Sequence, residues 1–112
     1  MKKRYAIGVD IGGSHISSVL VDVSSRKVFP ESAAEQKINN RAAAEEILAG
    51  WSVAIKKTLS HISVDELLGI GFAMPGPFDY AAGVSLIKGV EKYDSLYGIN
   101  VGDELKKILN LQ

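Results

Sequence analysis

The chain has 112 residues, of which 46% are hydrophobic and 23% are charged, and it contains no cysteine. This composition is that of a globular domain, and it excludes general disorder, disulfide bonds and thiolate metal sites. Lys plus Arg and Asp plus Glu number 13 each, so no net charge favours nucleic acid or an anionic membrane as a partner. We therefore expect a single cytoplasmic domain over residues 1–112, with neither nucleic-acid nor membrane partners.

The first third of the chain has the pattern of three consecutive strands. Hydrophobic and small residues alternate over residues 5–11, and residues 15–23 are rich in Ile and Val. A weaker strand follows over residues 27–38, and Pro30 places it at a sheet edge because proline cannot donate to a strand ladder. The short connections predict an antiparallel meander.

A helix and a further strand follow the meander. Hydrophobic residues recur every three or four positions from about Asn40 to Ser60, and Asn39 or Asn40 can cap the start of this helix. Gly50 inside it suggests a close packing contact. Residues 67–74 predict a buried strand that is apolar on both faces, and it should run parallel to the first strand because a long helical crossover precedes it.

The last third of the chain begins with a loop over residues 75–83, followed by a short strand over 84–87 and an irregular stretch over 90–99. Asn100 is expected to cap a closing helix. Four hydrophobic residues of this helix share one face: Val101, Leu105, Ile108 and Leu109. The order of elements predicts a three-layered α/β fold in which one flank of strand 67–74 lacks a neighbour, so that a partner or further chain should cover it.

The turn after the first strand carries the most informative motif, Asp10-Ile-Gly-Gly-Ser14. Gly12 and Gly13 tolerate positive φ and let backbone N–H groups approach an anion, and Ser14 adds a hydroxyl donor. Asp10 would repel a bare phosphate, but it suits a polyphosphate accompanied by Mg²⁺, which is usually held through water. An ordinary hairpin whose aspartate faces solvent fits the same spacing equally well.

Three segments together resemble the N-terminal part of the ROK family, which comprises repressors, open reading frames and sugar kinases of the actin-like ATPase superfamily. They are IGVDIGGSHISSVLVD at residues 7–22, GIGFAMPGPFDYAAGV at 69–84 and KYDSLYGINVGDEL at 92–105. The resemblance implies a ribonuclease H-like, actin-like half-domain: three antiparallel strands, then a parallel strand with packed helices. By the same resemblance residues 1–112 would be the N-terminal lobe, with the final strand and the C-terminal lobe absent.

The resemblance also implies roles for single residues. Asp10, Gly12, Gly13 and Ser14 match the turn that faces the β- and γ-phosphates of ATP, with Mg²⁺ held near Asp10 through water. The loop Pro75-Gly76-Pro77, and Gly89 after it, match the border of the sugar pocket.

Three side chains near these motifs have a less specific pattern. His15 stands where many relatives of the ROK type have lysine, and we expect it to be a half-buried strand residue with a possible contact to phosphate. Tyr93 and Tyr97 resemble an aromatic cage, but we expect them to pack between the loop and the closing helix.

A complete enzyme of this kind would be an ATP-dependent, glucokinase-like kinase that transfers the γ-phosphate to a hexose hydroxyl, with ATP and Mg²⁺ as cofactors. Its general base is the Asp of an Asn-Asp pair after the closing helix, and this sequence contains no such pair. The base is therefore expected beyond Gln112, and the isolated chain is expected to be inactive. The missing C-terminal lobe or a second copy of the chain would cover the exposed sheet edge.

Three alternatives remain. A ROK-type repressor fragment would need a DNA-binding domain ahead of the motif, and the first strand already begins by Arg4. A non-catalytic actin-like interaction module would keep the fold but not the chemistry. A ribonuclease H-like nuclease would need several clustered carboxylates, and besides Asp10 only Asp22 can be nominated, at the wrong end of the hairpin.

Overall fold

A computed structural model describes residues 3–73, 78–79, 84–85 and 93–111 of the chain. The strands are β1 (Tyr5–Ile11), β2 (His15–Asp22), β3 (Lys27–Lys37), β4 (Leu67–Ala73), β5 (Phe78–Asp79) and β6 (Val84–Ser85). The helices are α1 (Ala44–Leu59) and α2 (Val101–Leu109), with short 3-10 turns at Val64–Glu66 and Asp94–Leu96. Among the described helices, none is long and apolar enough to cross a bilayer.

The main sheet has the predicted topology. Its strand order is β3-β2-β1-β4, in which β1, β2 and β3 form an antiparallel meander and β4 runs parallel to β1. The strand that contains Pro30 lies at the edge, as predicted. The β2–β3 register shifts between Ser18 and Leu20, and there the amide of Leu20 donates to the hydroxyl of Ser32 at 2.8 Å. A side chain thus replaces a ladder bond at the irregular part of the edge strand.

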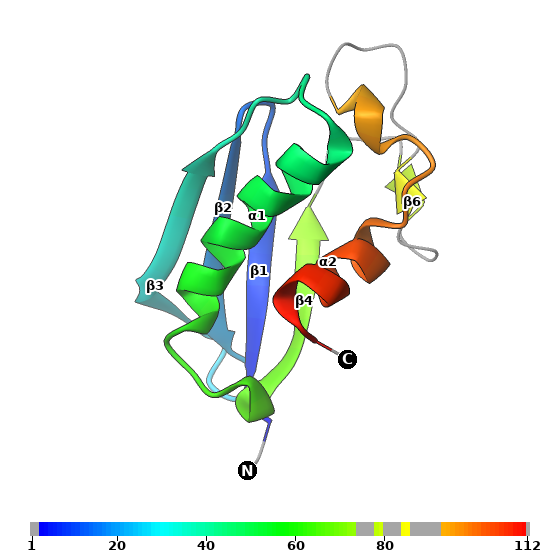
Figure 1. Cartoon of the computed structure of the whole chain (residues 1–112). Helices are drawn as coiled ribbons and strands as arrows, with labels where there is room; N and C mark the ends of the chain where they lie inside the picture. The colour runs from blue at the N-terminus through cyan, green and yellow to red at the C-terminus, as the bar shows by residue number, and fades with distance from the viewer. Residues whose placement is uncertain (1–2, 74–77, 80–83, 86–92, 112) are drawn as a thin grey trace.

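Both helices lie on the same face of this sheet (Figure 1). That face carries the core, which includes every second residue of β1 (Ile7, Val9 and Ile11) and the fully buried Trp51 of α1. On the opposite face a Cβ added at Gly8 would meet nothing within 4 Å. The described elements therefore make two layers rather than the three predicted. The expectation that β4 is buried on both faces is also wrong, because Leu68 is 51% exposed.

The predicted asparagine cap of α1 is wrong, because both asparagines are engaged elsewhere. The helix begins at Ala44, and its N-cap residue makes no side-chain cap hydrogen bond. Asn39 instead accepts from the amide of Arg41 at 3.1 Å, and Asn40 donates to the carbonyl oxygen of Gly13. The predicted cap of α2 is confirmed, since the side chain of Asn100 accepts from the Asp103 amide.

Two further packing predictions concern these helices. The close contact expected at Gly50 is confirmed, since a Cβ there would lie 2.7 Å from Ile38 Cδ1. Of the four residues expected to share the buried face of α2, three are buried, whereas Ile108 is 37% exposed. The exposed position of Ile108 limits the buried face of α2 to Val101, Leu105 and Leu109.

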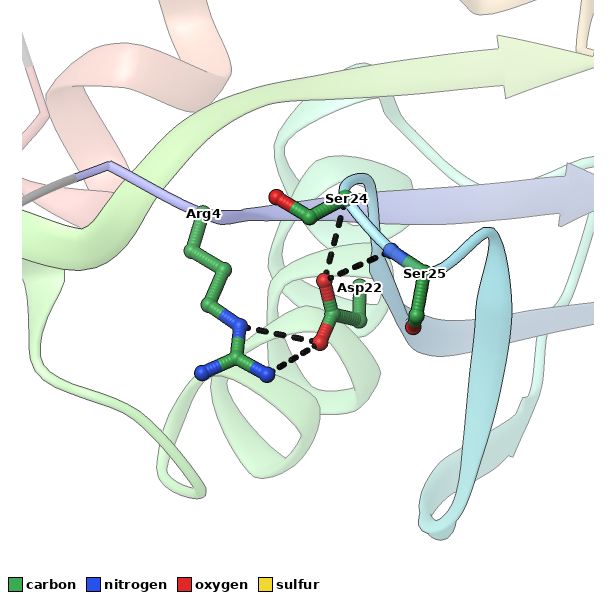
Figure 2. Close-up of polar contacts among 4 residues, drawn as sticks. All are labelled: Arg4, Asp22, Ser24 and Ser25. Carbon is green, nitrogen blue, oxygen red and sulfur yellow. Dashed lines mark hydrogen bonds and ion pairs between the residues drawn. The ribbon is translucent and has the colours of Figure 1, made fainter.

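Asp22 closes the far end of the meander (Figure 2). One carboxylate oxygen accepts from Arg4 Nη2 at 2.6 Å and from Nε at 2.9 Å, and the other accepts from the amides of Ser24 and Ser25. The hydrogen bond from Arg4 holds the pKa of Asp22 below its usual value. This carboxylate is thus engaged in joining the β2–β3 turn to the start of β1, which leaves it unsuited to the nuclease alternative.

Candidate functional site

The Asp10–Ser14 motif forms the tight connection between β1 and β2, as predicted. The ladder ends at the Ile11–Ile16 pair, and the amide of Gly12 donates to the carbonyl oxygen of His15 at 2.9 Å. Gly12 does not occupy the left-handed region that the motif suggested, and a Cβ at this position would meet the same carbonyl oxygen at an ordinary 3.5 Å. The fold of this chain by itself therefore does not require glycine at position 12.

The three carbonyl groups of the turn are all held from outside the turn. The hydroxyl of Tyr93 donates to Gly12 at 2.6 Å, the side chain of Asn40 donates to Gly13, and the amide of Ile38 donates to Ser14 at 2.7 Å. Sequence reasoning missed the roles of Tyr93 and Asn40. Neither role has a local sequence signal, because these side chains reach the turn from 81 and 27 positions away.

Two amides of the same turn, those of Gly13 and Ser14, are left available. Within the described part of the chain, neither the Gly13 nor the Ser14 N–H donates to an acceptor. In a trans peptide the N–H points away from the carbonyl of the same unit, so these two amides face away from the partners that hold the carbonyls. Adjacent unpaired amides form the kind of concavity that binds an anion.

Asp10 lies at the end of β1 and is exposed. It borders an open depression of about 600 Å³ on the sheet, together with Gly8, Ser17, Val19 and Glu35. Among the described residues no cluster of three carboxylate or histidine side chains could hold a metal alone. Mg²⁺ typically takes one or two carboxylates and completes its shell with water and phosphate oxygens. One exposed carboxylate beside an amide pair fits that donor set.

His15 is exposed rather than half-buried, with 51% of its side chain accessible. Its Nδ1 lies 2.9 Å from the Ser14 hydroxyl, and its Nε2 lies 3.9 Å from a carboxylate oxygen of Glu35. The expectation of a half-buried histidine is wrong because His15 alternates with the buried Ile16 along β2 and so lies on the face of the sheet away from the core. The Ser14 hydroxyl thus has His15 as a partner, whereas the backbone amides of Gly13 and Ser14 have no acceptor among the described residues.

Tyr93 is packed in the core as expected, but its aromatic partner is Trp51 of α1 and not a residue of the closing helix. It is fully buried, with its ring centroid 5.7 Å from that of Trp51. Burial raises the pKa of the Tyr93 hydroxyl, which therefore stays a protonated donor at neutral pH. Tyr97, by contrast, is 51% exposed. The predicted sugar-pocket residues Pro75, Gly76, Pro77 and Gly89 lie outside the described residues.

The outer flank of β4 has no neighbouring strand in the described part of the chain, as expected. Beside it runs a groove of about 660 Å³ between β4 and α2. Its apolar lining comes from both elements and from the end of the chain: Leu68, Ile70, Phe72, Leu105, Leu109 and Leu111. This groove and the free strand edge together make a surface without a partner among the described residues.

No family model matches the chain, and no curated protein matches its sequence. Solved structures do match its fold. An inorganic polyphosphate/ATP-glucomannokinase from Arthrobacter sp. strain KM has a TM-score of 0.74 at 21% identity, covering 97% of this chain and 42% of the kinase. A ROK hexokinase from Thermus thermophilus has a TM-score of 0.67 at 16% identity, covering 96% of this chain and 33% of the hexokinase.

A ROK family glucokinase from Streptomyces griseus, solved in complex with glucose and AMPPNP, also has a TM-score of 0.67, at 23% identity. The match covers 96% of this chain and 31% of the glucokinase. The chain thus spans less than half the length of each of these three kinases. These structural neighbours are sugar kinases, two of them described as members of the ROK family, and the chain has the mixed α/β fold of a part of them.

Proposed function

We propose that the chain is the N-terminal, phosphate-binding lobe of an ATP-dependent, glucokinase-like sugar kinase. The observation that carries the proposal is that the amides of Gly13 and Ser14 have no acceptor among the described residues and closely follow the exposed Asp10 in the chain. Support also comes from the neighbours, one of which is described as a glucokinase in complex with glucose and AMPPNP. We place the activity in the cytoplasm, in line with the composition.

In this proposal the turn binds the terminal phosphates of ATP through backbone N–H groups. Mg²⁺, when bound, would neutralise phosphate charge, and Asp10 would hold it through water. Residues Pro75, Gly76, Pro77 and Gly89 would border the hexose. The general base would lie in the part of a complete kinase that follows Gln112, so we expect the chain alone to bind phosphate without transferring it.

The test is a titration of the isotope-labelled chain with Mg·AMPPNP, followed by amide NMR. We expect saturable shifts at Gly13 and Ser14, and the binding should weaken when Mg²⁺ is omitted. Asp10→Asn should remove most of the Mg²⁺ dependence, whereas Asp65→Asn, an exposed carboxylate at the opposite end of the sheet, should not. A titration in which neither turn amide shifts would contradict the proposal.

We further propose that the C-terminal lobe of the complete kinase covers the free flank of β4. The apolar lining of the β4–α2 groove and the 51% exposure of Leu68 favour an apolar occupant. The chain alone should therefore bind a hydrophobic dye, and Leu68→Glu should reduce that binding more than Val53→Glu, a change at an exposed residue of α1. Light scattering tests the alternative occupant, since a concentration-dependent dimer that Leu68→Glu dissociates would point to a second copy of the chain.

A further inference from the structure

We infer that Tyr93 and Asn40 are positioning residues for the candidate phosphate-binding turn. Together they form what we call the carbonyl clamp: the Tyr93 hydroxyl holds the carbonyl of Gly12, and the Asn40 side chain holds the carbonyl of Gly13. This inference rests on the proposed function and deepens it, because it names two side chains outside the motif that would set the orientation of the anion-binding amides.

The orientation follows from the planarity of the peptide unit. The Gly12 carbonyl and the Gly13 N–H belong to one plane and point in opposite directions, as do the Gly13 carbonyl and the Ser14 N–H. Fixing each carbonyl therefore turns each N–H away from the clamp, and neither N–H donates to an acceptor among the described residues. Without the clamp these peptide units could rotate, and a rotated unit would present a carbonyl oxygen, which repels phosphate.

The backbone of Tyr93 is fixed by a hydrogen bond, and its ring is fixed by an aromatic contact. Its φ is 57°, which is an uncommon and strained conformation for an aromatic residue. Its amide donates to the carbonyl oxygen of Asn40 at 2.7 Å, and its ring packs on Trp51. Strain of this kind persists where the surroundings fix it, and here they fix a hydroxyl 2.6 Å from Gly12.

Asn40 connects the two halves of the clamp. Its backbone carbonyl accepts from Tyr93, while its side chain donates to Gly13. A second hydrogen bond joins the same two segments, since the Ser95 hydroxyl donates to the carbonyl oxygen of Ala42 at 2.7 Å. The segment that carries Tyr93 is thus joined to the segment before α1 at two points, and both segments are fixed relative to the turn.

The experiment uses the full chain with Mg²⁺ and sodium tripolyphosphate as the probe, and it measures Kd from the Gly13 and Ser14 amide shifts. Tyr93→Phe keeps the ring and removes the donor, so we expect Kd to rise about three- to tenfold, the effect of one lost hydrogen bond. Asn40→Ala, which keeps the backbone carbonyl that Tyr93 uses, should act in the same direction. Tyr5→Phe is the matched control, because it removes the hydroxyl group of a tyrosine at the opposite end of β1.

A second measurement of the clamp needs no ligand. Loss of the donor should shift the carbonyl-carbon resonance of Gly12 in Tyr93→Phe but not in Tyr5→Phe, and a role in packing alone would not produce that difference. If the wild-type chain binds tripolyphosphate and both clamp variants keep its Kd within about twofold, the clamp is overturned and the proposed function stands. If the wild-type turn amides do not respond at all, the phosphate site itself is overturned, and the inference with it.

Discussion

The rings of Trp51 and Tyr93 lie with their centroids 5.7 Å apart and their planes at 59°, and both side chains are completely buried. This pair joins α1 to the segment that precedes α2. It also places the Tyr93 hydroxyl against the turn between β1 and β2. One residue therefore serves the core with its ring and the candidate site with its oxygen, and the two contributions can be separated by substitution.

Removing the ring should cost far more stability than removing the oxygen. We expect Tyr93→Ala to lower the free energy of unfolding by about 3–5 kcal/mol, since it leaves a cavity beside Trp51. Tyr93→Phe should cost about 1 kcal/mol, the value of one hydrogen bond. Urea unfolding followed by the fluorescence of Trp51, the one tryptophan of the chain, measures both. Equal costs for the two variants would contradict this division.

Gly12→Ala should separate folding from phosphate binding. An added Cβ meets only the His15 carbonyl oxygen at 3.5 Å, and φ is outside the left-handed region. Alanine also reduces the entropy of the unfolded chain, so stability should stay the same or rise by up to about 1 kcal/mol. The extra methyl group should nevertheless weaken tripolyphosphate binding, because close approach to the backbone is what glycine permits. A thermal melt measures the stability of this variant, and an NMR titration measures its affinity for tripolyphosphate. An unchanged affinity would contradict a functional role for Gly12.

The Arg4–Asp22 pair should make stability depend on acid pH. The hydrogen bond from Arg4 lowers the folded-state pKa of Asp22, so its contribution is fully present above the unfolded value of about 3.9. That contribution is lost as the pH falls below this value and through the folded pKa. The difference in urea midpoint between wild type and Asp22→Asn should therefore be constant near neutrality and close in acid. Glu31→Gln, an exposed carboxylate of β3, should show no comparable closing gap.

Gly50 and Ile38 should show coupled effects. Alanine in a helix is more favourable than glycine by about 1 kcal/mol, but a Cβ at position 50 would lie 2.7 Å from Ile38 Cδ1. We expect Gly50→Ala alone to gain less than this, because the Ile38 side chain must move. In an Ile38→Val background the interfering atom is absent, and the full gain should appear. A double-mutant cycle by urea unfolding measures the coupling, and additive effects would show that the contact relaxes freely.

The sequence was sufficient to predict the meander, the helical crossover and the parallel strand, because each has its own hydrophobic period and clear turn residues. It was also sufficient for the Asn100 cap, which is a local interaction. It failed for the asparagines before α1, since the same residue type suits a helix cap and a contact across the fold. The side chain of Asn40 donates a hydrogen bond to Gly13, 27 positions away in the sequence, and no local pattern indicates such a contact.

The motif of the candidate site was predicted from the sequence, but the side chains that hold its carbonyl groups were not. The glycine pair and Asp10 have a motif because the residues are contiguous. The burial of Tyr93 was predictable from its aromatic character, but its hydrogen bond to Gly12 depends on the tertiary fold. The exposure of His15 was missed because a strand pattern says which residues alternate, not which face of the sheet the helices leave uncovered.

Within the described sheet β4 is joined to β1 alone, Gly71 stands directly opposite Gly8, and the register between these strands slips beside Leu68. Because β4 has only one neighbouring strand and its register is irregular, its amides should exchange with solvent sooner than those of the meander, whose central strand is paired on both sides. Detachment of β4 would leave the β1–β2 hairpin intact. The turn that carries the candidate anion-binding amides thus belongs to the part of the sheet that should open later.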